Sequence, residues 1–508
     1  MFAGERVAAP AERVDAVRGD RIAGCGLGLG LGDQDIERID QPRDRGGLQE
    51  STHLVRADER VDFHIPWFGG RADAPHGTTS SPSGTFVPRG ARPGTAEADR
   101  MSTSLGREGD RATVAAPQPH DFLGIDALLT DDERLIRDTV RAFVRDRILP
   151  HVAEWFERGD FPREIAKELG DLGLLGMHLE GYGCTGASAV AYGLACLELE
   201  AGDSGFRSFV SVQGSLAMYA LSAFGSEEQK QQWLPRMAAG DAIGCFGLTE
   251  PDFGSDPAGM RTVARRSGSD YVLSGTKTWI TNGGIADLAI VWARVDPEDG
   301  PRSGTVRGFV VPTTTKGFST RNIERKLSLR ASVTSELILE ECRVPADAIL
   351  PGVSGLRGPL SCLNEARYGI VWGALGAART CYETALEYAK TRVQFDKPIA
   401  AFQITQEKLV NMMLELNKGL LTALHIGRLK DQGRAHPAHV SFGKLNNVRE
   451  ALAICREART ILGASGITLE YPIIRHMNNL ESVLTYEGTS EIHTLILGQA
   501  LTGESAFG

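Results

Sequence analysis

Apolar residues recur with a helical period through two long regions of the chain, and this pattern predicts two helix-rich regions. The first begins near Leu129, where Thr130 and Glu133 are predicted to form a capping box, and is broken at Pro150. Its helices are predicted at 129–149, 163–174, 188–201, 207–223 and 226–239. The second is predicted to hold helices at 361–391, 400–432, 436–463 and 475–500. Four long amphipathic helices in succession are typical of an antiparallel bundle.

Between the two helical regions the pattern changes to short β-branched runs separated by turn residues. Strands are predicted at 271–281, 288–295, 307–313 and 336–345. The order along the chain is therefore helices, strands and helices again, without internal repeats. This order predicts an α+β multidomain protein with an N-terminal helical domain (118–242), a middle β-domain (243–355) and a C-terminal four-helix bundle domain (356–508).

Residues 1–117 show neither the helical nor the strand period of apolar residues, and they are rich in Gly, Arg, Asp and Pro. Acidic residues among the arginines argue against a transit peptide, and no apolar segment suits a secretory signal. The composition indicates disorder. A second hypothesis is that translation starts at Met101, so that the first hundred residues are an extension created by mis-annotation.

Composition narrows the class of protein. A net charge of -10 disfavours nucleic acid or an anionic membrane as the main partner, and no apolar run is long enough to span a bilayer. The eight cysteines are scattered, without paired or metal-ligand spacing. They predict reduced thiols in a cytoplasmic protein without a bound metal.

One stretch near the C-terminus, LTYEGTSEI at 484–492, combines the features that a catalytic base beside a flat cofactor needs. Glu487 stands between Tyr486 and Gly488 at a predicted junction of two helices. Thr489 is a good N-cap for the second helix, and Gly488 permits unusual backbone angles and a close approach to the main chain. An ordinary helix end with a solvated glutamate is the alternative interpretation.

Two stretches of the β-domain carry residues that suit contacts with the same flat cofactor. CFGLTEPDFGSD (245–256) supplies hydroxyls and turns that can hydrogen-bond a polar ring edge. KTWITN (277–282) places Trp279 and Thr281 two residues apart, hence on one face of a regular strand. A Trp wall with a hydroxyl beside it suits the face and edge of an isoalloxazine ring.

Together these three motifs resemble the acyl-CoA dehydrogenase family of flavoproteins, and the resemblance runs from about residue 122 to the C-terminus. It implies the three domains in the order given above, FAD as cofactor and a homotetramer. By resemblance, the flavin-ring contacts are Phe246, Leu248, Thr249, Trp279 and Thr281, and Ser255 is a contact to ring or phosphate groups. RVQFDKPIAAFQ (392–403) resembles the segment that reaches FAD of a neighbouring subunit through Arg392, Phe395 and Gln403. Thr489 and Glu491 match positions that touch the FAD phosphates and ribose.

The resemblance makes Glu487 the catalytic base. Removal of the weakly acidic α-proton of a thioester requires a desolvated carboxylate, and the β-hydride is expected to pass to the flavin. Some branches of the family place the base before an arginine in an earlier helix. Here that pair is Ala366-Arg367, so this second candidate is missing.

ELEAGDSGFRSF (198–209) bears on the substrate, because a cation is costly in a pocket for an apolar acyl chain. It resembles the glutaryl-CoA dehydrogenase branch, in which the residues that match Arg207 and Ser208 hold the distal carboxylate and the one that matches Glu200 lies beside it. LNEARYGIVWG (363–373) also resembles this branch and supplies Asn364 and Arg367. Tyr486 and Glu200 are expected to tune decarboxylation.

The sequence therefore predicts an FAD-dependent enzyme that oxidises and decarboxylates glutaryl-CoA to crotonyl-CoA and CO2, with electron-transfer flavoprotein as acceptor. The alternatives are a dehydrogenase of another short-chain acyl-CoA and a glutaryl-CoA dehydrogenase that does not decarboxylate. A third is a flavin-binding member that serves nucleic-acid binding or assembly. The presence of Glu487 and the lack of a basic tail disfavour this third class.

Overall fold

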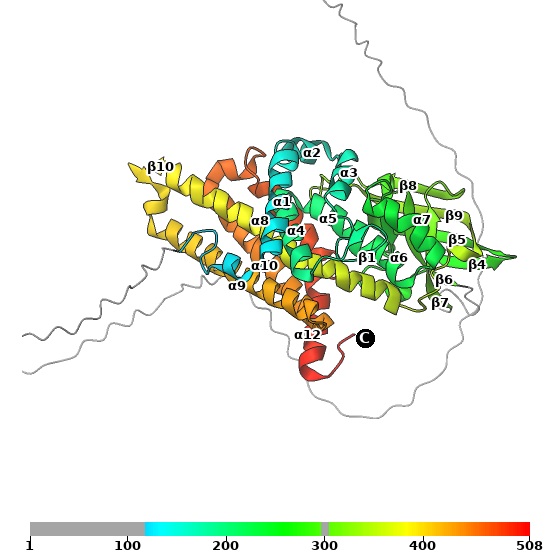
Figure 1. Ribbon diagram of the computed structural model, residues 1–508. Coiled ribbons are helices and arrows are strands. Elements are labelled where there is room, and N and C mark those ends of the chain that lie inside the picture. The colour runs from blue at the N-terminus through cyan, green and yellow to red at the C-terminus, as the bar shows by residue number, and fades with distance from the viewer. Residues whose placement is uncertain (1–116, 296–303, 508) are drawn as a thin grey trace, which may run out of the picture. The chain divides into compact units, whose positions relative to one another are not determined.

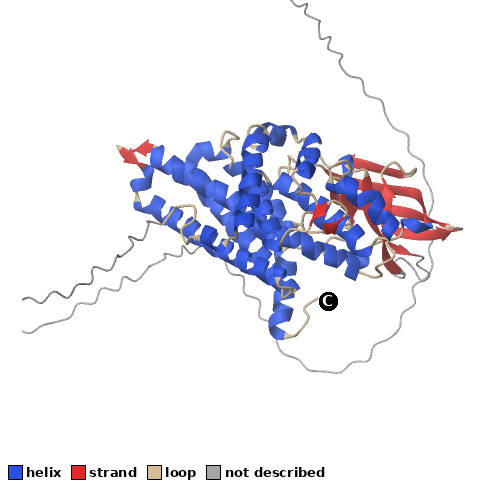
Figure 2. Ribbon diagram, in the orientation of Figure 1, coloured by secondary structure: helices blue, strands red, loops and turns tan. Residues whose placement is uncertain are grey.

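The computed structural model of the protein describes residues 117–295 and 304–507. The predictions of disorder and of a start at Met101 concern residues outside this range. Figure 1 shows the elements in chain order, and Figure 2 shows that the longer strands gather in one sheet beside a larger set of helices.

The helices fall into an N-terminal and a C-terminal group on either side of the sheet in the sequence. The first group is α1 (Asp131–Phe143), α2 (Val152–Arg158), α3 (Glu164–Asp171), α4 (Ala189–Gly202), α5 (Ser204–Ser211), α6 (Tyr219–Phe224) and α7 (Glu227–Ala238). The second group is α8 (Arg357–Thr391), α9 (Gln403–Asp431), α10 (Pro437–Leu462), α11 (Ile473–Thr485) and α12 (Ser490–Thr502).

The first helix begins where its capping residues predict. The Thr130 side chain accepts a hydrogen bond from the Glu133 backbone N–H at 3.2 Å, and the Glu133 carboxylate accepts one from the Thr130 N–H at 2.9 Å. This reciprocal pair satisfies two of the four free N–H groups at the helix start. The capping box predicted from the sequence is confirmed.

The main sheet has seven strands. They are β3 (Gly244–Gly247), β4 (Val263–Ser267), β5 (Asp270–Thr281), β6 (Leu288–Val295), β7 (Thr305–Pro312), β8 (Phe318–Asn322) and β9 (Thr334–Pro345), in the order β3-β6-β4-β5-β9-β8 with β7 paired to β6. Strand β6 is buried along almost its whole length, since β7 pairs with one edge and β3 and β4 share the other. Two small hairpins, β1–β2 (Glu180–Gly181 and Cys184–Thr185) and β10–β11 (Val393–Gln394 and Lys397–Pro398), lie outside this sheet.

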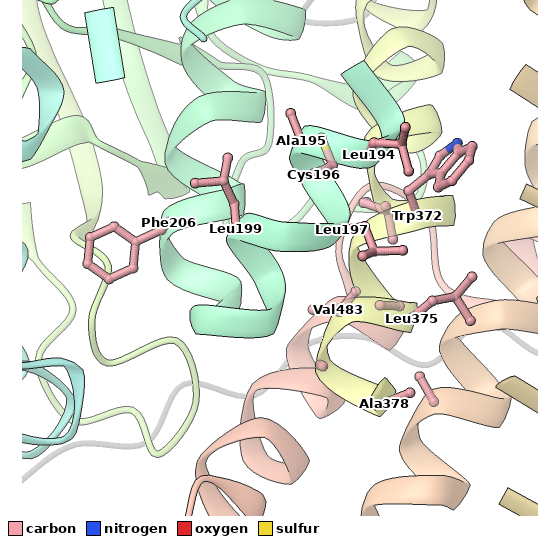
Figure 3. Close-up of a cluster of buried hydrophobic side chains, with 14 of the residues drawn as sticks. Leu194, Ala195, Cys196, Leu197, Leu199, Phe206, Trp372, Leu375, Ala378 and Val483 are labelled. Carbon is pink, nitrogen blue, oxygen red and sulfur yellow. The ribbon is translucent and has the colours of Figure 1, made fainter. Parts of the chain in front are cut away.

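The largest core forms where α4 packs along α8, and α10 packs on α8 as well. All of α4 is buried, which explains why its apolar residues show little amphipathic pattern. Figure 3 shows Leu194 and Leu197 of α4 on the side of Trp372 and Leu375 of α8, and Leu199 on the opposite side of α4, towards Phe206. This pairing joins the N-terminal helices to the C-terminal bundle and sets the position of α5, which follows α4 directly.

The predicted fold class is confirmed: helical domain, β-domain and helical bundle occur in that order. The strand prediction 288–295 coincides with β6, and 226–239 differs from α7 by one residue at each end. The sequence missed α2, β3, β4 and β8, which are short. It gave 475–500 as one helical stretch, but the junction of two helices predicted at Glu487 is confirmed, since α11 ends at Thr485 and α12 begins at Ser490. The three domain boundaries remain predictions.

A buried carboxylate ties the two helical regions together. Glu198 on α4 receives two hydrogen bonds from Arg379 of α8, both at 2.7 Å, and two from Arg141 of α1 at 2.9 and 3.1 Å. Burial alone raises the pKa of Glu198, but the two guanidinium groups outweigh it and hold this pKa at about 2.

We expect Glu198→Gln to lower the free energy of unfolding by about 3 kcal/mol at pH 7, because it leaves Arg379, whose side chain is largely buried, without its charged partner. The pKa of Glu198 is depressed in the folded state, so its stabilisation is present above pH 4.5 and is lost as the pH falls towards 2. Denaturant unfolding at pH 7 and pH 4 measures both effects. The matched control is Glu481→Gln, since Glu481 pairs with Arg456 on the surface and its loss should cost less than about 1 kcal/mol. Equal effects of the two variants would contradict the prediction.

Within the described residues, no helix has both the length and the apolar composition to cross a membrane. The seven cysteines of this part of the chain are all free thiols, and two of them, Cys381 on α8 and Cys455 on α10, lie with their sulfur atoms 3.3 Å apart.

Candidate active site

The stretch at 484–492 forms a tight turn between α11 and α12. Glu487 has a φ of 54° and Gly488 one of 100°, both in the left-handed region. A side chain at Gly488 would bring its Cβ within 2.9 Å of His493 Nε2 and 3.4 Å of Arg367. Only glycine therefore fits there, whereas a left-handed backbone at a glutamate is strained and is commonly found at functional sites. Thr489 caps α12 by accepting a hydrogen bond from the Ile492 N–H, as predicted.

Two cations, the buried Lys444 and the half-buried Arg367, hold the backbone of this turn. Lys444 on α10 donates to the carbonyls of Tyr486 and Gly488 at 2.8 and 2.7 Å, and Arg367 on α8 donates from Nε to the carbonyl of Glu487 at 2.7 Å. Three successive carbonyl groups are therefore fixed from two different helices. The strained conformation at Glu487 is held by this network.

The carboxyl group of Glu487 is set up for proton transfer. Its Oε2 is buried and has no hydrogen-bond partner among the described residues. Burial raises the pKa of Glu487, and the positive charges of Arg207, Lys444 and Arg367 offset part of that rise. A desolvated carboxylate without a partner is free to accept a proton from a bound molecule.

Arg207, on α5, lies beside this turn and is completely buried. Its Nε donates to Glu200 Oε2 at 2.6 Å, and its Nη2 donates to the hydroxyl of Tyr486. Its Nη1 has no partner among the described residues. The hydroxyl of Ser208 lies 3.1 Å from that of Tyr486. Arg207 and Ser208 are therefore linked through Tyr486 to the residue that precedes Glu487.

A buried guanidinium with a free N–H group is well suited to bind a carboxylate. Leaving a charged donor unpaired in the interior is costly, and an anionic ligand removes that cost. Glu200 accepts hydrogen bonds from Arg207 and, at 2.8 Å, from Ser204, so it is already engaged. The site can accept one further acidic group at Arg207.

The β-domain residues expected at the flavin ring differ in exposure. Phe246 and Leu248 are buried, Thr281 is half-buried and Trp279 is 62% exposed with a φ of 60°. The pairing of β5 with β9 shifts by one residue between Lys277 and Ile280, a β-bulge. Trp279 lies within this bulge, and its placement on one face with Thr281 remains a prediction.

These residues fit a planar cofactor. An indole ring that is exposed on a strained, bulged backbone presents a flat face without a protein partner. Thr249, in the loop after β3, accepts a hydrogen bond from the Thr278 N–H through its backbone carbonyl. The Thr249 hydroxyl takes no part in this bond. Ser255 is exposed in the loop that follows β3, and Asn364 is half-buried one turn before Arg367 on α8. Their roles remain predictions.

The segment expected to reach the adenine end of FAD lies away from Glu487 in this chain. Arg392 follows Arg367 by 25 residues at the end of α8, a rise of about 37 Å along the helix. Arg392 and Gln403 are exposed, and Phe395, in the β10–β11 hairpin, is 87% exposed. Glu491 is exposed in the first turn of α12. One chain thus does not bring Arg392, Phe395 and Gln403 together with the catalytic turn, whereas Glu491 lies four residues after Glu487.

Three residues near the site escaped the sequence reasoning: Lys444, His493 and Gly373. Lys444 shares a buried stripe of α10 with Val440, Asn447 and Val448, so a lysine on the apolar face of a helix was the available signal. Gly373 and His493 gave none, because their importance comes from what packs against them.

The comparisons with known proteins agree with this geometry. The models of the N-terminal, middle and C-terminal domains of acyl-CoA dehydrogenase match residues 130–241, 245–342 and 354–502. The chain belongs to the acyl-CoA dehydrogenase family. It is an oxidoreductase of the flavoprotein class, and the expectation of FAD as cofactor is confirmed.

Individual relatives can be named. The chain is 37% identical to the human mitochondrial short-chain specific acyl-CoA dehydrogenase over 372 residues, which cover 73% of this chain and 90% of the relative. A crystal structure of glutaryl-CoA dehydrogenase from Mycobacterium smegmatis is 67% identical with a TM-score of 0.75, and covers 77% of this chain and 100% of the neighbour. A glutaryl-CoA dehydrogenase from Mycobacterium smegmatis in complex with FADH2 is 64% identical, also with a TM-score of 0.75, and covers 77% of this chain and 100% of the neighbour.

Proposed function

We propose that the protein is a glutaryl-CoA dehydrogenase that oxidises and decarboxylates glutaryl-CoA to crotonyl-CoA and CO2. The observation that carries the proposal is the fully buried Arg207, whose Nη1 has no partner among the described residues. Its Nη2 donates to the hydroxyl of Tyr486, the residue that precedes Glu487. The M. smegmatis neighbours support it, as does a further structure, titled as the glutaryl-coenzyme A dehydrogenase glutaryl-CoA complex, with 32% identity and a TM-score of 0.70 that covers 74% of this chain and 96% of the neighbour.

In the proposed reaction Arg207 binds the distal carboxylate of the substrate through Nη1, with Ser208 and Tyr486 as its neighbours. This contact orients the acyl chain so that the thioester end meets Glu487. Glu487 then removes the α-proton, since its burial keeps the carboxylate free of competing hydrogen bonds. FAD, when bound, supplies the acceptor for the β-hydride.

The second half-reaction breaks the bond between the γ-carbon and the terminal carboxylate of the resulting glutaconyl-CoA. The electron pair of this bond passes into the system conjugated with the thioester, CO2 leaves, and protonated Glu487 returns a proton to the γ-carbon to give crotonyl-CoA. Glu200 already occupies Nε of Arg207, so its negative charge weakens the grip of Arg207 on the substrate carboxylate. A weaker ion pair favours loss of CO2.

The direct test mixes the purified yellow protein with glutaryl-CoA without oxygen and analyses the products. Flavin bleaching with formation of crotonyl-CoA and CO2 is the expected result. Glutaconyl-CoA as the sole product would remove decarboxylation from the proposal and keep the substrate. Bleaching by butyryl-CoA and none by glutaryl-CoA would replace the proposal with a dehydrogenase for another short acyl-CoA.

The proposal extends to the assembly and the electron acceptor. Arg392, Phe395 and Gln403 follow the far end of α8, about 37 Å along the helix from Arg367, and we assign them to a cofactor in another copy of the chain. We therefore expect a homotetramer, which light scattering on the eluting protein measures, and electron-transfer flavoprotein as acceptor. A monomer with full FAD content would contradict this arrangement.

Gly373 on α8 gives a prediction about substrate choice. A Cβ at this position would overlap Glu200 Oε2 and lie 3.1 Å from Arg207 Nε, so any side chain displaces the ion pair. We expect Gly373→Ala to lower kcat/KM for glutaryl-CoA by about tenfold or more and to affect butyryl-CoA less. The matched control is Gly498→Ala on α12, where nothing lies within 4 Å of the new Cβ. Equal losses with both substrates would contradict this specificity role.

A further inference from the structure

Lys444 is a buried cation to which the proposed reaction assigns no role. It lies on α10, is 2% exposed and donates to two neutral carbonyls, those of Tyr486 and Gly488, at 2.8 and 2.7 Å. These two carbonyls flank Glu487 on either side. Burying an ammonium group costs several kcal/mol, and two carbonyls compensate only part of this cost.

The shape of the ammonium group explains why a lysine suits this place. It is a compact charge with three donors at the end of a flexible stem, so it can contact two carbonyls that point to one place. Those carbonyls belong to residues one before and one after a glutamate with a φ of 54°. A clamp on both sides opposes relaxation of Glu487 to an unstrained backbone.

The charges around Lys444 come from four elements. Glu487, in the turn, attracts it, whereas Arg367 on α8 and Arg207 on α5 repel it. His493 on α12 adds no charge, because burial, with Lys444 and Arg367 nearby, lowers the pKa of His493 to about 3. Burial lowers the pKa of Lys444 to about 7, and the negative charge of Glu487 opposes this change. The Glu487 carboxylate is thus the group that favours the charged form of Lys444.

We infer that Lys444 is a positioning residue of the dehydrogenation reaction: it clamps the strained turn from which the Glu487 carboxylate projects. Its positive charge also works to lower the pKa of Glu487, against the larger effect of burial. The inference rests on the proposed role of Glu487 as the base. Lys444 acts through the backbone of the turn and touches neither the substrate nor the reacting atoms in this assignment.

Three substitutions separate the clamp from the charge. Lys444→Met removes both, Lys444→Gln keeps two N–H donors without the charge, and Lys444→Arg keeps the charge on a larger, planar group. The measurement is the rate of flavin reduction by glutaryl-CoA in anaerobic stopped flow, over a range of pH and substrate concentration. Flavin content and the dissociation constant of the substrate are recorded for each variant.

For Lys444→Met we expect reduction about 10- to 100-fold slower, with flavin content and substrate dissociation constant close to those of the original protein. Loss of the cation raises the pKa of Glu487, so the acidic limb of the pH profile moves to higher pH. Lys444→Gln should recover part of the rate and keep the shifted limb, whereas Lys444→Arg should keep the original limb with a lower rate. Lys418→Gln, an exposed lysine paired with Glu415 on α9, is the control.

Unchanged rates and pH profiles in the Lys444 variants would overturn the inference, and so would a slower rate explained entirely by lost flavin. If Lys444→Met does not fold, the Gln and Arg variants still decide the question through their opposite pH behaviour. Glu487→Gln distinguishes the two levels of the argument. An active Glu487→Gln enzyme would contradict the proposed function. An inactive Glu487→Gln enzyme, together with Lys444 variants that are unaffected, would contradict only the role of Lys444.

Discussion

Replacing Glu487 by glutamine is expected to slow flavin reduction by glutaryl-CoA by about three orders of magnitude, the middle of the range for loss of a positioned general base. Glutamine has nearly the same shape and can keep the strained turn, but its amide does not accept the α-proton. Because the Glu487 carboxylate lies among three cations, its neutralisation leaves them less compensated, so flavin content and the free energy of unfolding are measured beside the rate. Stopped-flow reduction of the flavin measures the rate, and binding of substrate should persist.

The control for this variant is Glu481→Gln on α11, six residues before Glu487 in the sequence and paired with Arg456 at the surface. It should reduce its flavin at the original rate. If Glu487→Gln keeps more than about a tenth of the original rate while its flavin content is normal, another group removes the proton. The missing glutamate at Ala366 leaves no second carboxylate at the position used by other branches of the family.

The second large effect is expected at Arg207. Removing one partner of a buried charge pair costs about 2–5 kcal/mol in binding, so Arg207→Met should lower kcat/KM for glutaryl-CoA by about 30- to 5000-fold. The same change should leave butyryl-CoA turnover intact or raise it, because the cation no longer disfavours an apolar acyl chain. The ratio of kcat/KM for the two substrates is the measurement.

Arg207→Met alone leaves Glu200 as a buried carboxylate whose remaining donor is Ser204, which can destabilise the protein by itself. The double variant Arg207→Met with Glu200→Gln avoids that problem and should show the same change of substrate ratio. Arg207→Lys tests geometry, since it keeps the charge and loses the fork that serves Glu200, Tyr486 and the substrate at once. If Arg207→Met keeps the original preference for glutaryl-CoA, the proposed substrate is wrong.

The two variants separate binding from chemistry because the structure separates them. Arg207 and Glu487 reach the site from α5 and from the turn between α11 and α12, and Tyr486 is the residue that contacts the first and precedes the second. We therefore expect Glu487→Gln to change the rate and Arg207→Met to change mainly the choice of substrate. A shift of both quantities in both variants would mean that the Tyr486 bridge couples them.

The sequence determined the order of helices and strands, because long amphipathic segments and β-branched runs carry local signals that tertiary contacts reinforce. It also determined the capping of α1 by Thr130 and of α12 by Thr489, since capping depends on residues three positions apart. The family followed from motifs at Glu487 and Trp279. Short elements such as β3 and β4 escaped, because four or five residues give too little periodicity.

Only the tertiary structure decided what surrounds the chemistry. Lys444 meets the catalytic turn across 42 residues of sequence and Arg367 across 120, so neither contact has a local signal. The bulge at Trp279 arises from pairing between β5 and β9, which a single strand does not encode. The free Nη1 of Arg207 and the lone Oε2 of Glu487 are likewise properties of packing. The sequence supplies the reactive groups, and the fold decides which of them are buried together, because burial and charge act between residues that are distant along the chain.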